Sequence, residues 1–206
     1  MAVIKAIIFD WGGVLIEDPT SGLTGYCTKA LGASEKEYRK AREIFGDDFQ
    51  TGRISEEQFW ANMTNQLRVP MPKQKSLWGE AFASIYKPRP DMFRIAGTLK
   101  NRGYKIALLS NTERPAVEFF KSQRYDLFDA AIFSCLEGTK KPEREIYEIA
   151  IKRIGTTGGQ TLFVDDREDF VAGAKEAGLV TILFESVAAF KKDLVRHCPG
   201  IIAGME

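Results

Sequence analysis

Polar side chains that could do chemistry follow three apolar runs that lie far apart in this chain of 206 residues. The runs AIIF, IALL and TLFV end at these side chains: Asp10, Ser110, Asn111, Asp165 and Asp166. A further charged group, Lys141, stands in EGTKKPE, just before a segment with helical spacing. Two adjacent acids repel each other unless a cation lies between them, so Asp165 and Asp166 indicate a cation site.

The elements that must position these groups can be predicted from the apolar pattern. Five runs rich in β-branched residues predict buried strands over residues 5–9, 104–109, 131–134, 161–164 and 180–184. Helical patterns separate the later runs, and one predicts a helix over residues 142–154, with Pro142 in its first turn and Gly155 at its end. Alternating strands and helices predict a parallel sheet flanked by helices. Ligands bind beyond the carboxyl ends of such strands, so we expect the polar groups at one edge of the sheet.

One interval, residues 19–87, shows helical signatures and no convincing strand. The patterns Ser34-x-x-Glu37 and Ser55-x-x-Gln58 are typical of capping boxes that begin helices. The sequence KPRP at residues 87–90 closes the interval, because residues before proline avoid the helical conformation. We therefore expect a core of residues 1–17 and 89–206, with a helical cap of residues 18–88 inserted after the first strand.

Each polar group also has an ordinary structural interpretation. Asp10 could be a turn or capping residue, and Ser110 stands in SNT, a common turn and cap sequence. Lys141 could be solvated, and Asp165 and Asp166 could complement a helix dipole. What favours a functional site is that all of these groups fall at strand ends or next to them.

Composition excludes several classes of function. The chain has 29 basic and 28 acidic residues, for a net charge of +1, so we expect neither a nucleic-acid nor a membrane partner. The cysteines, Cys27, Cys135 and Cys198, have no C-x-x-C spacing, which indicates reduced thiols. The first apolar run is too short and too polar for a signal peptide or a spanning helix. We expect a cytoplasmic protein.

In their order along the chain, the motifs resemble those of the haloacid dehalogenase-like hydrolase superfamily. They read IIFDWGGVL, IALLSNT, GTKKPEREIY and TLFVDDREDFVAGAKEAG, and the resemblance covers nearly the whole chain. It implies an α/β fold with a Rossmann-like five-stranded parallel sheet and a small helical cap. The phosphatase-like branch is the most similar, which includes the N-terminal domain of soluble epoxide hydrolase and sugar-phosphate phosphatases.

The resemblance also implies roles for particular residues. Asp10 would attack phosphorus and form a phosphoaspartate, and Lys141 would pair with Asp10 and with the phosphate. Mg²⁺ would be bound by four groups: Asp10, Asp165, Asp166 and the backbone carbonyl of Gly12. The substrate would be a small phosphorylated metabolite, held by these residues: Trp11, Gly12, Gly13, Ser110 and Asn111. Oligomeric state is left open between monomer and homodimer.

Two positions depart from the family pattern. Phosphatases of the family commonly have a second aspartate, which serves as general acid and base, where this chain has Gly12. In the fourth motif, Phe170 stands where the family often has Asn or Asp, and its helical neighbours favour core packing. Replacements for the missing acid could come from these residues, each of which also suits the surface or a helix cap: Glu17, Asp18, Asp47 and Asp48.

The sequence therefore leaves three functions open. A Mg²⁺-dependent phosphatase without the second acid should prefer substrates with good leaving groups. A 2-haloacid dehalogenase tolerates glycine at residue 12, but needs no metal and lacks the paired aspartates. A non-catalytic module that binds phosphate or a partner is the third possibility.

Several other residues have ordinary interpretations. His197 is expected at a helix end on the surface, and Arg53 in a solvated turn. Trp11 could face the substrate or pack beneath the cap. Aromatic residues of the insert are expected to pack between cap helices: Phe59, Trp60, Trp78 and Phe82.

Overall fold

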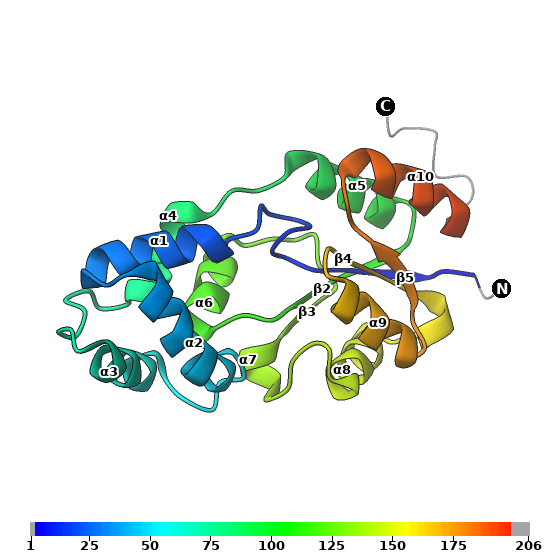
Figure 1. Cartoon of the computed structure of the whole chain (residues 1–206). Coiled ribbons are helices and arrows are strands. Elements are labelled where there is room, and N and C mark those ends of the chain that lie inside the picture. Colours follow the sequence, from blue (N-terminus) through cyan, green and yellow to red (C-terminus); the bar gives the residue numbers. More distant parts are fainter. Residues whose placement is uncertain (1–2, 199–206) are drawn as a thin grey trace.

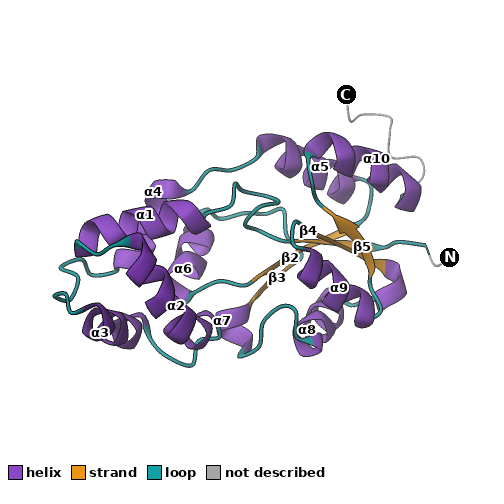
Figure 2. Ribbon diagram, viewed as in Figure 1, coloured by secondary structure: helices purple, strands orange, loops and turns teal. Residues whose placement is uncertain are grey.

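A parallel five-stranded sheet forms the centre of the larger part of the molecule (Figures 1 and 2). The computed structural model describes residues 3–198. The strands are β1 (Ala6–Phe9), β2 (Lys105–Ser110), β3 (Ala130–Phe133), β4 (Thr161–Asp165) and β5 (Val180–Leu183), in the order β3-β2-β1-β4-β5. The expected fold class is confirmed, and the strand bounds differ from those expected by one residue at some ends.

Helices cover both faces of this sheet. They are α5 (Pro90–Asn101), α6 (Arg114–Ser122), α7 (Ser134–Glu137), α8 (Arg144–Ile154), α9 (Glu168–Glu176) and α10 (Val187–His197), with a 3₁₀ turn at Gly158–Gln160. Side chains alternate along a strand, so Ile7 and Phe9 pack in the cluster that contains residues of α5 and α10. Ala6 and Ile8 pack on the other face, with residues of α8 and α9. Burial on both faces explains the continuous apolar runs in the sequence.

The helix predicted over residues 142–154 begins later than expected. α8 starts at Arg144, and the residue before it, Glu143, has an extended backbone with φ −60° and ψ 134°. The placement of Pro142 in the first turn was therefore wrong. The expected end is confirmed, because Gly155 adopts a left-handed conformation with φ 68° and ends the helix.

The interval between β1 and α5 contains four helices, α1 (Thr20–Leu31), α2 (Glu35–Gln50), α3 (Glu56–Leu67) and α4 (Leu77–Ile85). Ser55 and Gln58 form the expected capping box at the start of α3. At the start of α2, Ser34 accepts a hydrogen bond from the backbone of Glu37, while its hydroxyl donates to the Glu37 carboxylate at 2.6 Å. Both predicted helix starts are thus confirmed, and the boundary between cap and core stays a prediction.

Aromatic side chains hold the inserted helices together. The rings of Phe49 and Phe59 stack with centroids 4.4 Å apart, and Trp78 meets Phe59 edge-on at 5.8 Å. Phe59 and Trp78 are fully buried. The expected packing between cap helices is confirmed for Phe59, Trp60 and Trp78, whereas Phe82 packs against Trp11 and Phe119 of the core.

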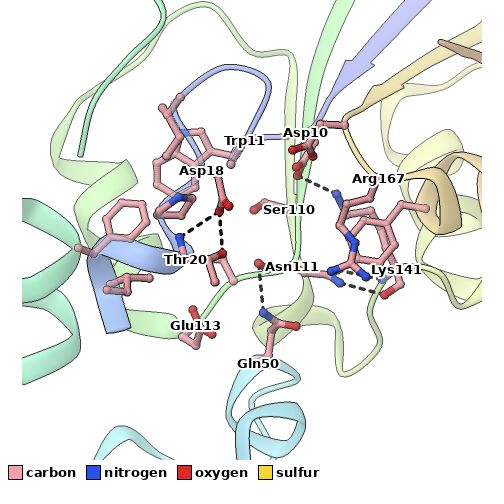
Figure 3. A pocket seen from close by; sticks show the side chains of 18 of the residues that line it. Asp10, Trp11, Asp18, Thr20, Gln50, Ser110, Asn111, Glu113, Lys141 and Arg167 are labelled. Atoms are coloured by element: carbon pink, nitrogen blue, oxygen red, sulfur yellow. Dashed lines mark hydrogen bonds and ion pairs between the residues drawn. The ribbon is translucent and has the colours of Figure 1, made fainter. Parts of the chain in front are cut away.

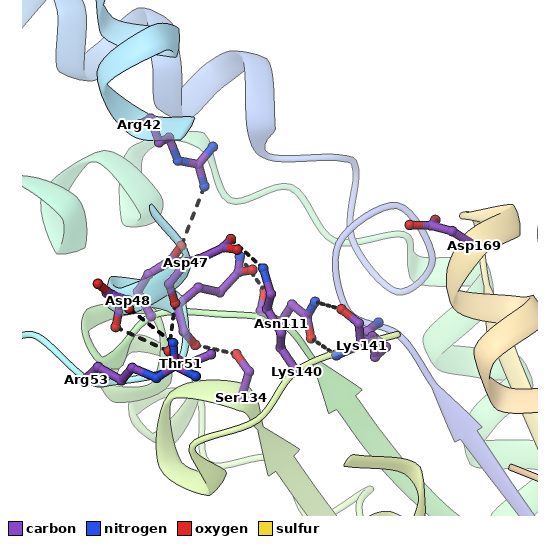
Figure 4. Close-up of polar contacts among 12 residues, drawn as sticks. Arg42, Asp47, Asp48, Thr51, Arg53, Asn111, Ser134, Lys140, Lys141 and Asp169 are labelled. Carbon is purple, nitrogen blue, oxygen red and sulfur yellow. Dashed lines mark hydrogen bonds and ion pairs between the residues drawn. The ribbon is translucent and has the colours of Figure 1, made fainter. Parts of the chain in front are cut away.

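The two segments that join the insert to the sheet run side by side. The backbone N–H of Glu17 donates to the carbonyl of Lys87 at 2.9 Å, and that of Arg89 donates to the carbonyl of Leu15 at 2.9 Å. A second attachment lies at Ser134, whose hydroxyl donates to the carbonyl of Gln50 at 2.6 Å and accepts from the N–H of Thr112 at 2.9 Å (Figure 4). The joining segments and Ser134 therefore both attach the insert to the core.

Within residues 3–198, no helix combines the length and the apolar character needed to cross a lipid bilayer.

Candidate active site

The carboxyl ends of β1, β2 and β4 meet beneath the inserted helices and open into a cavity of about 400 Å³ (Figure 3). β1 lies between β2 and β4, so Asp10, Ser110 and Asp165 end neighbouring strands. The cavity walls include Asp10, Ser110, Lys141 and Asp166. The sheet thus brings together the segments that the sequence places far apart.

Lys141 lies between two carboxylates. Its Nζ is 2.7 Å from Oδ1 of Asp10 and 2.6 Å from Oδ2 of Asp165, and the residue is 1% exposed. Its backbone is held by the Asn111 side chain, which donates to the Lys141 carbonyl at 2.9 Å and accepts from the Lys141 N–H at 2.8 Å. The buried ammonium group is fixed in position and its charge is compensated.

The electrostatics of the cluster reflect burial opposed by pairing. Burial raises the pKa of Asp10 to about 7, although the positive charge of Lys141 opposes the rise. Burial, followed by the negative charge of Asp165, raises the pKa of Asp166. Burial alone would lower the pKa of Lys141, but Asp10 and Asp165 outweigh it and the pKa is raised. Further positive charge beside these carboxylates would favour their ionised forms.

Asp10, Asp165 and Asp166 form a cluster that fits a divalent metal ion. Each offers one carboxylate oxygen, and these three oxygens lie within 4.8 Å of one another. Clustered carboxylate oxygens are the ligands that Mg²⁺ prefers. Gly12 lines the same cavity, and its carbonyl as a further ligand stays a prediction.

Gly13 makes room for this cluster. Its φ is +90°, and a Cβ atom at this position would lie 2.1 Å from Oδ2 of Asp166. Glycine is therefore required here both by the backbone conformation and by the close approach of the Asp166 carboxylate.

The residues expected to bind phosphate have different surroundings. Ser110 is buried beside Asp10, and Figure 3 shows its side chain at the cavity. The Asn111 side chain also borders the cavity, but both of its polar atoms are bonded to the backbone of Lys141. Its visible role is to position Lys141, and its contact with phosphate stays a prediction.

Trp11 of the first motif and Phe170 of the fourth are buried among other side chains, and both also line the cavity. Trp11 is 1% exposed and contacts Phe82 and Phe120, with ring centroids 5.0 and 5.4 Å apart. It thus packs beneath the inserted helices. Phe170 is buried, and the Lys141 ammonium lies 4.8 Å from the centre of its ring. The apolar interpretation of Phe170 agrees with this packing.

Charged residues that the sequence analysis did not single out complete the walls. Arg42 of α2 reaches Glu113 of the core at 3.5 Å and lies over the Trp78 ring (Figure 4 shows Arg42). Glu113 is buried, and burial raises its pKa, with Arg42 opposing the rise. Arg42 and Arg167 also border an adjoining cavity of about 610 Å³. No motif marks Arg42, because its position depends on how the inserted helices pack.

The structure places the four acids considered as replacements for the missing acid in different surroundings. Asp18 lines the same cavity as Asp10, and Asp47 lines the adjoining one. Glu17 pairs with Lys87 at 2.7 Å, and Asp48 pairs with Arg53 at 3.2 Å. Glu17, Asp48 and Arg53 line neither cavity.

His197 and the cysteines also lie outside the site. His197 is the last residue of α10 and borders neither cavity. Cys27, Cys135 and Cys198 are buried free thiols, as expected.

Two curated phosphatases are similar to this chain in sequence over most of its length. The chain is 29% identical to the sesquiterpene phosphatase astK of Aspergillus oryzae over 187 residues, which are 89% of this chain and 92% of that protein. It is 26% identical to a D-ribitol-5-phosphate phosphatase of Bacteroides thetaiotaomicron, over 93% of this chain and 97% of that one.

Solved structures show the same fold. The HAD family enzyme bt-2542 of Bacteroides thetaiotaomicron, in complex with magnesium and inorganic phosphate, is 22% identical with a TM-score of 0.75. The match covers 91% of this chain and 98% of that one. The family model for haloacid dehalogenase-like hydrolases matches residues 4–178, and the chain belongs to this family.

Proposed function

We propose that the protein is a Mg²⁺-dependent phosphohydrolase that cleaves a small phosphate monoester through a phosphoaspartate at Asp10. The observation that carries the proposal is the buried contact of Lys141 with both Asp10 and Asp165, beside Asp166 at the wall of a cavity. Curated relatives of similar length are named as phosphatases, which supports the same reaction class.

Asp10, Asp165 and Asp166 would hold the magnesium ion, with the Gly12 carbonyl as a further ligand. When bound, the ion neutralises charge on the phosphate and so permits the approach of an anionic nucleophile. Lys141 holds the attacking carboxylate in place through Oδ1 and supplies a second positive charge. Ser110 and the N–H group of Gly12 bind phosphate oxygens, whereas the Gly13 N–H donates to the Ile16 carbonyl at 2.9 Å.

In the first step, an oxygen of Asp10 attacks phosphorus and the bond from phosphorus to the ester oxygen breaks. The leaving oxygen takes the electron pair of that bond. Gly12 offers no carboxyl group to protonate it. In the second step, water attacks the phosphoaspartate, phosphate is released and the Asp10 carboxylate is restored.

The absence of a carboxyl group at residue 12 predicts a strong preference for good leaving groups. General acid assistance contributes roughly 10²- to 10⁴-fold, and poor leaving groups need it most. We expect aryl, acyl and anomeric sugar phosphates to be hydrolysed far faster than simple alkyl phosphates. Comparing kcat/KM across such a panel measures this preference, and equal values for aryl and alkyl esters would contradict it.

The same panel, assayed with and without Mg²⁺, tests the proposed function itself. Asp10→Asn should lower activity by about 10³-fold or more, because the nucleophile is removed. Loss of activity on chelation should be reversed by added Mg²⁺. Activity that survives in Asp10→Asn, or release of halide from a 2-haloacid without Mg²⁺, would overturn the proposal.

Gly12 favours one alternative, a non-catalytic module that binds phosphate or a partner. In that case the wild-type protein would bind inorganic phosphate with Mg²⁺ but would not hydrolyse p-nitrophenyl phosphate or acetyl phosphate. Isothermal titration together with the same assays separates the two functions.

A further inference from the structure

A side chain at residue 12 would begin against the ring of Pro19, the residue after Asp18. A Cβ atom built on Gly12 would lie 3.0 Å from Cδ of Pro19, so the proline ring lies where that side chain would begin. Asp18, Pro19 and Thr20 all line the cavity that contains Asp10. This segment therefore borders the reaction space on the side that a carboxyl group at residue 12 would occupy.

Asp18 brings a carboxylate to this side of the cavity. Its Oδ1 accepts two hydrogen bonds, from the Thr20 N–H at 3.0 Å and from the Thr20 hydroxyl at 2.6 Å. Among the hydrogen bonds of residues 3–198, Oδ2 of Asp18 accepts none. Figure 3 shows Asp18, Ser110 and Asp10 among the residues that line the cavity, with the Asp18 carboxylate joined to Thr20. One oxygen thus orients the group and the other remains available to a ligand or to water.

We propose that Asp18 is the catalytic base of the second step and supplies from residue 18 the proton acceptor that residue 12 lacks. This inference rests on the proposed phosphatase function. Asp18 takes one proton from the attacking water, and the water oxygen forms the new bond to phosphorus. The bond from phosphorus to the Asp10 oxygen breaks, and its electron pair returns to the Asp10 carboxylate.

The assignment to the second step follows from the access of water to the group. Asp18 is exposed, and its Oδ2 accepts no hydrogen bond from the described residues, so water, the reactant of the second step, can reach this oxygen. The role proposed for Asp18 is confined to this step, and the leaving group in the first step receives no proton from it. The preference for good leaving groups and the assistance to hydrolysis are then separate properties of one site.

The competing role for Asp18 is structural, since its Oδ1 holds the N–H and the hydroxyl of Thr20 just before the first turn of α1, whose N-cap is Pro19. Asp18→Asn separates the two roles. The amide oxygen of asparagine can accept the same two hydrogen bonds, so the fold and its stability should be kept, but an amide cannot accept the proton. Asp18→Ala would remove both functions.

The experiment is rapid-quench kinetics with p-nitrophenyl phosphate and Mg²⁺, on wild type, Asp18→Asn, Asp10→Asn and Glu17→Gln. Glu17 is the matched control, because it is the neighbouring exposed acid, pairs with Lys87 and does not line the cavity. In Asp18→Asn we expect a burst of p-nitrophenolate close to one equivalent at an undiminished rate, followed by a steady state about 10²- to 10⁴-fold slower than wild type. Phosphorylated enzyme should accumulate and be detected by intact-protein mass spectrometry.

The possible failures are distinguishable. A wild-type steady-state rate in Asp18→Asn, with Asp10→Asn inactive, would overturn the role of Asp18 and leave the phosphatase intact. An equal loss of burst and steady state would also overturn it, because the first step should not need Asp18. A wild-type protein without turnover, or an active Asp10→Asn, would overturn the phosphatase itself. Glu17→Gln should match wild type throughout, and a slow steady state in this variant too would show a general charge effect and overturn the assignment.

Discussion

At the scale of single residues, Lys141 is a buried cation that pairs with two carboxylates. It is almost fully buried and lies within 2.7 Å of Asp10 and within 2.6 Å of Asp165. Removing one partner from a buried charge group leaves the others uncompensated, which is more costly than losing an exposed pair.

This contrast predicts the stability of two neighbouring variants. Lys141→Met should lower the free energy of unfolding by about 3 to 5 kcal/mol in metal-free buffer at neutral pH. Lys140→Met should lower it by about 1 kcal/mol or less, because Lys140 pairs with Asp47, which is exposed. Urea denaturation measures both, and equal losses would contradict the assignment of Lys141 as the buried centre of the cluster.

Gly13 permits a second prediction at this scale, with Gly103 as its control. Both glycines have φ near +90°, but a Cβ atom on Gly103 would have no heavy atom within 4 Å. Gly103→Ala should therefore show the conformational cost alone, about 1 to 2 kcal/mol. Gly13→Ala should add displacement of Asp166 and weaken Mg²⁺ binding by about 10- to 100-fold, measured by titrating activity with Mg²⁺. Unchanged Mg²⁺ affinity would remove Asp166 from the metal site.

At the scale of elements, α2 and the start of α6 are joined by Arg42 and Glu113. Glu113 is buried, and its raised pKa means that the folded protein binds its proton more tightly than the unfolded chain does. The associated stabilisation is present below pH 4.5, the ordinary pKa of this group, and is lost as the pH rises through the raised value.

Glu113→Gln tests this linkage, because glutamine cannot ionise. As the pH rises above 4.5, we expect wild type to lose stability relative to Glu113→Gln, so the difference between their unfolding free energies should change with pH. Glu118→Gln is the control, since Glu118 lies on the same helix, is exposed and pairs with Lys121. Parallel pH profiles for wild type and Glu113→Gln would contradict the buried placement of this carboxyl group.

The elements also show what the sequence could and could not predict. The meeting of Asp10, Ser110 and Asp165 was predictable, because parallel strands end at a common edge and apolar runs mark the strands. The late start of α8 was not, because the backbone before it follows contacts of Asn111 that join distant segments. Arg42 carries no sequence signal, because tertiary packing decides which side chains of the inserted helices face the core, and Glu113 carries none because its partner Arg42 is distant in sequence.

At the scale of the whole molecule, the inserted helices and the sheet share one apolar core. The buried cluster that contains Ile7 and Phe9 of β1 extends without interruption to Phe59 of α3 and Trp78 of α4. Continuous burial of this kind couples the stability of the two parts.

We therefore expect unfolding in one cooperative transition. Tryptophan fluorescence reports on the insert and its contact with the sheet, because the tryptophans are Trp11, Trp60 and Trp78. Far-ultraviolet circular dichroism reports on all helices and strands. Their denaturation midpoints should coincide, whereas an earlier fluorescence transition would show that the insert unfolds on its own.

The paired joining segments and the Ser134 attachment also constrain how a substrate arrives. They lie on different parts of the boundary, at Glu17 with Lys87 and at Ser134 with Gln50, so rotating all four inserted helices outward would break hydrogen bonds at one of them. We expect the diffusion path to run instead through the larger adjoining cavity, past the guanidinium groups of Arg42 and Arg167. The width of that passage would then limit the size of the organic group that can accompany the phosphate.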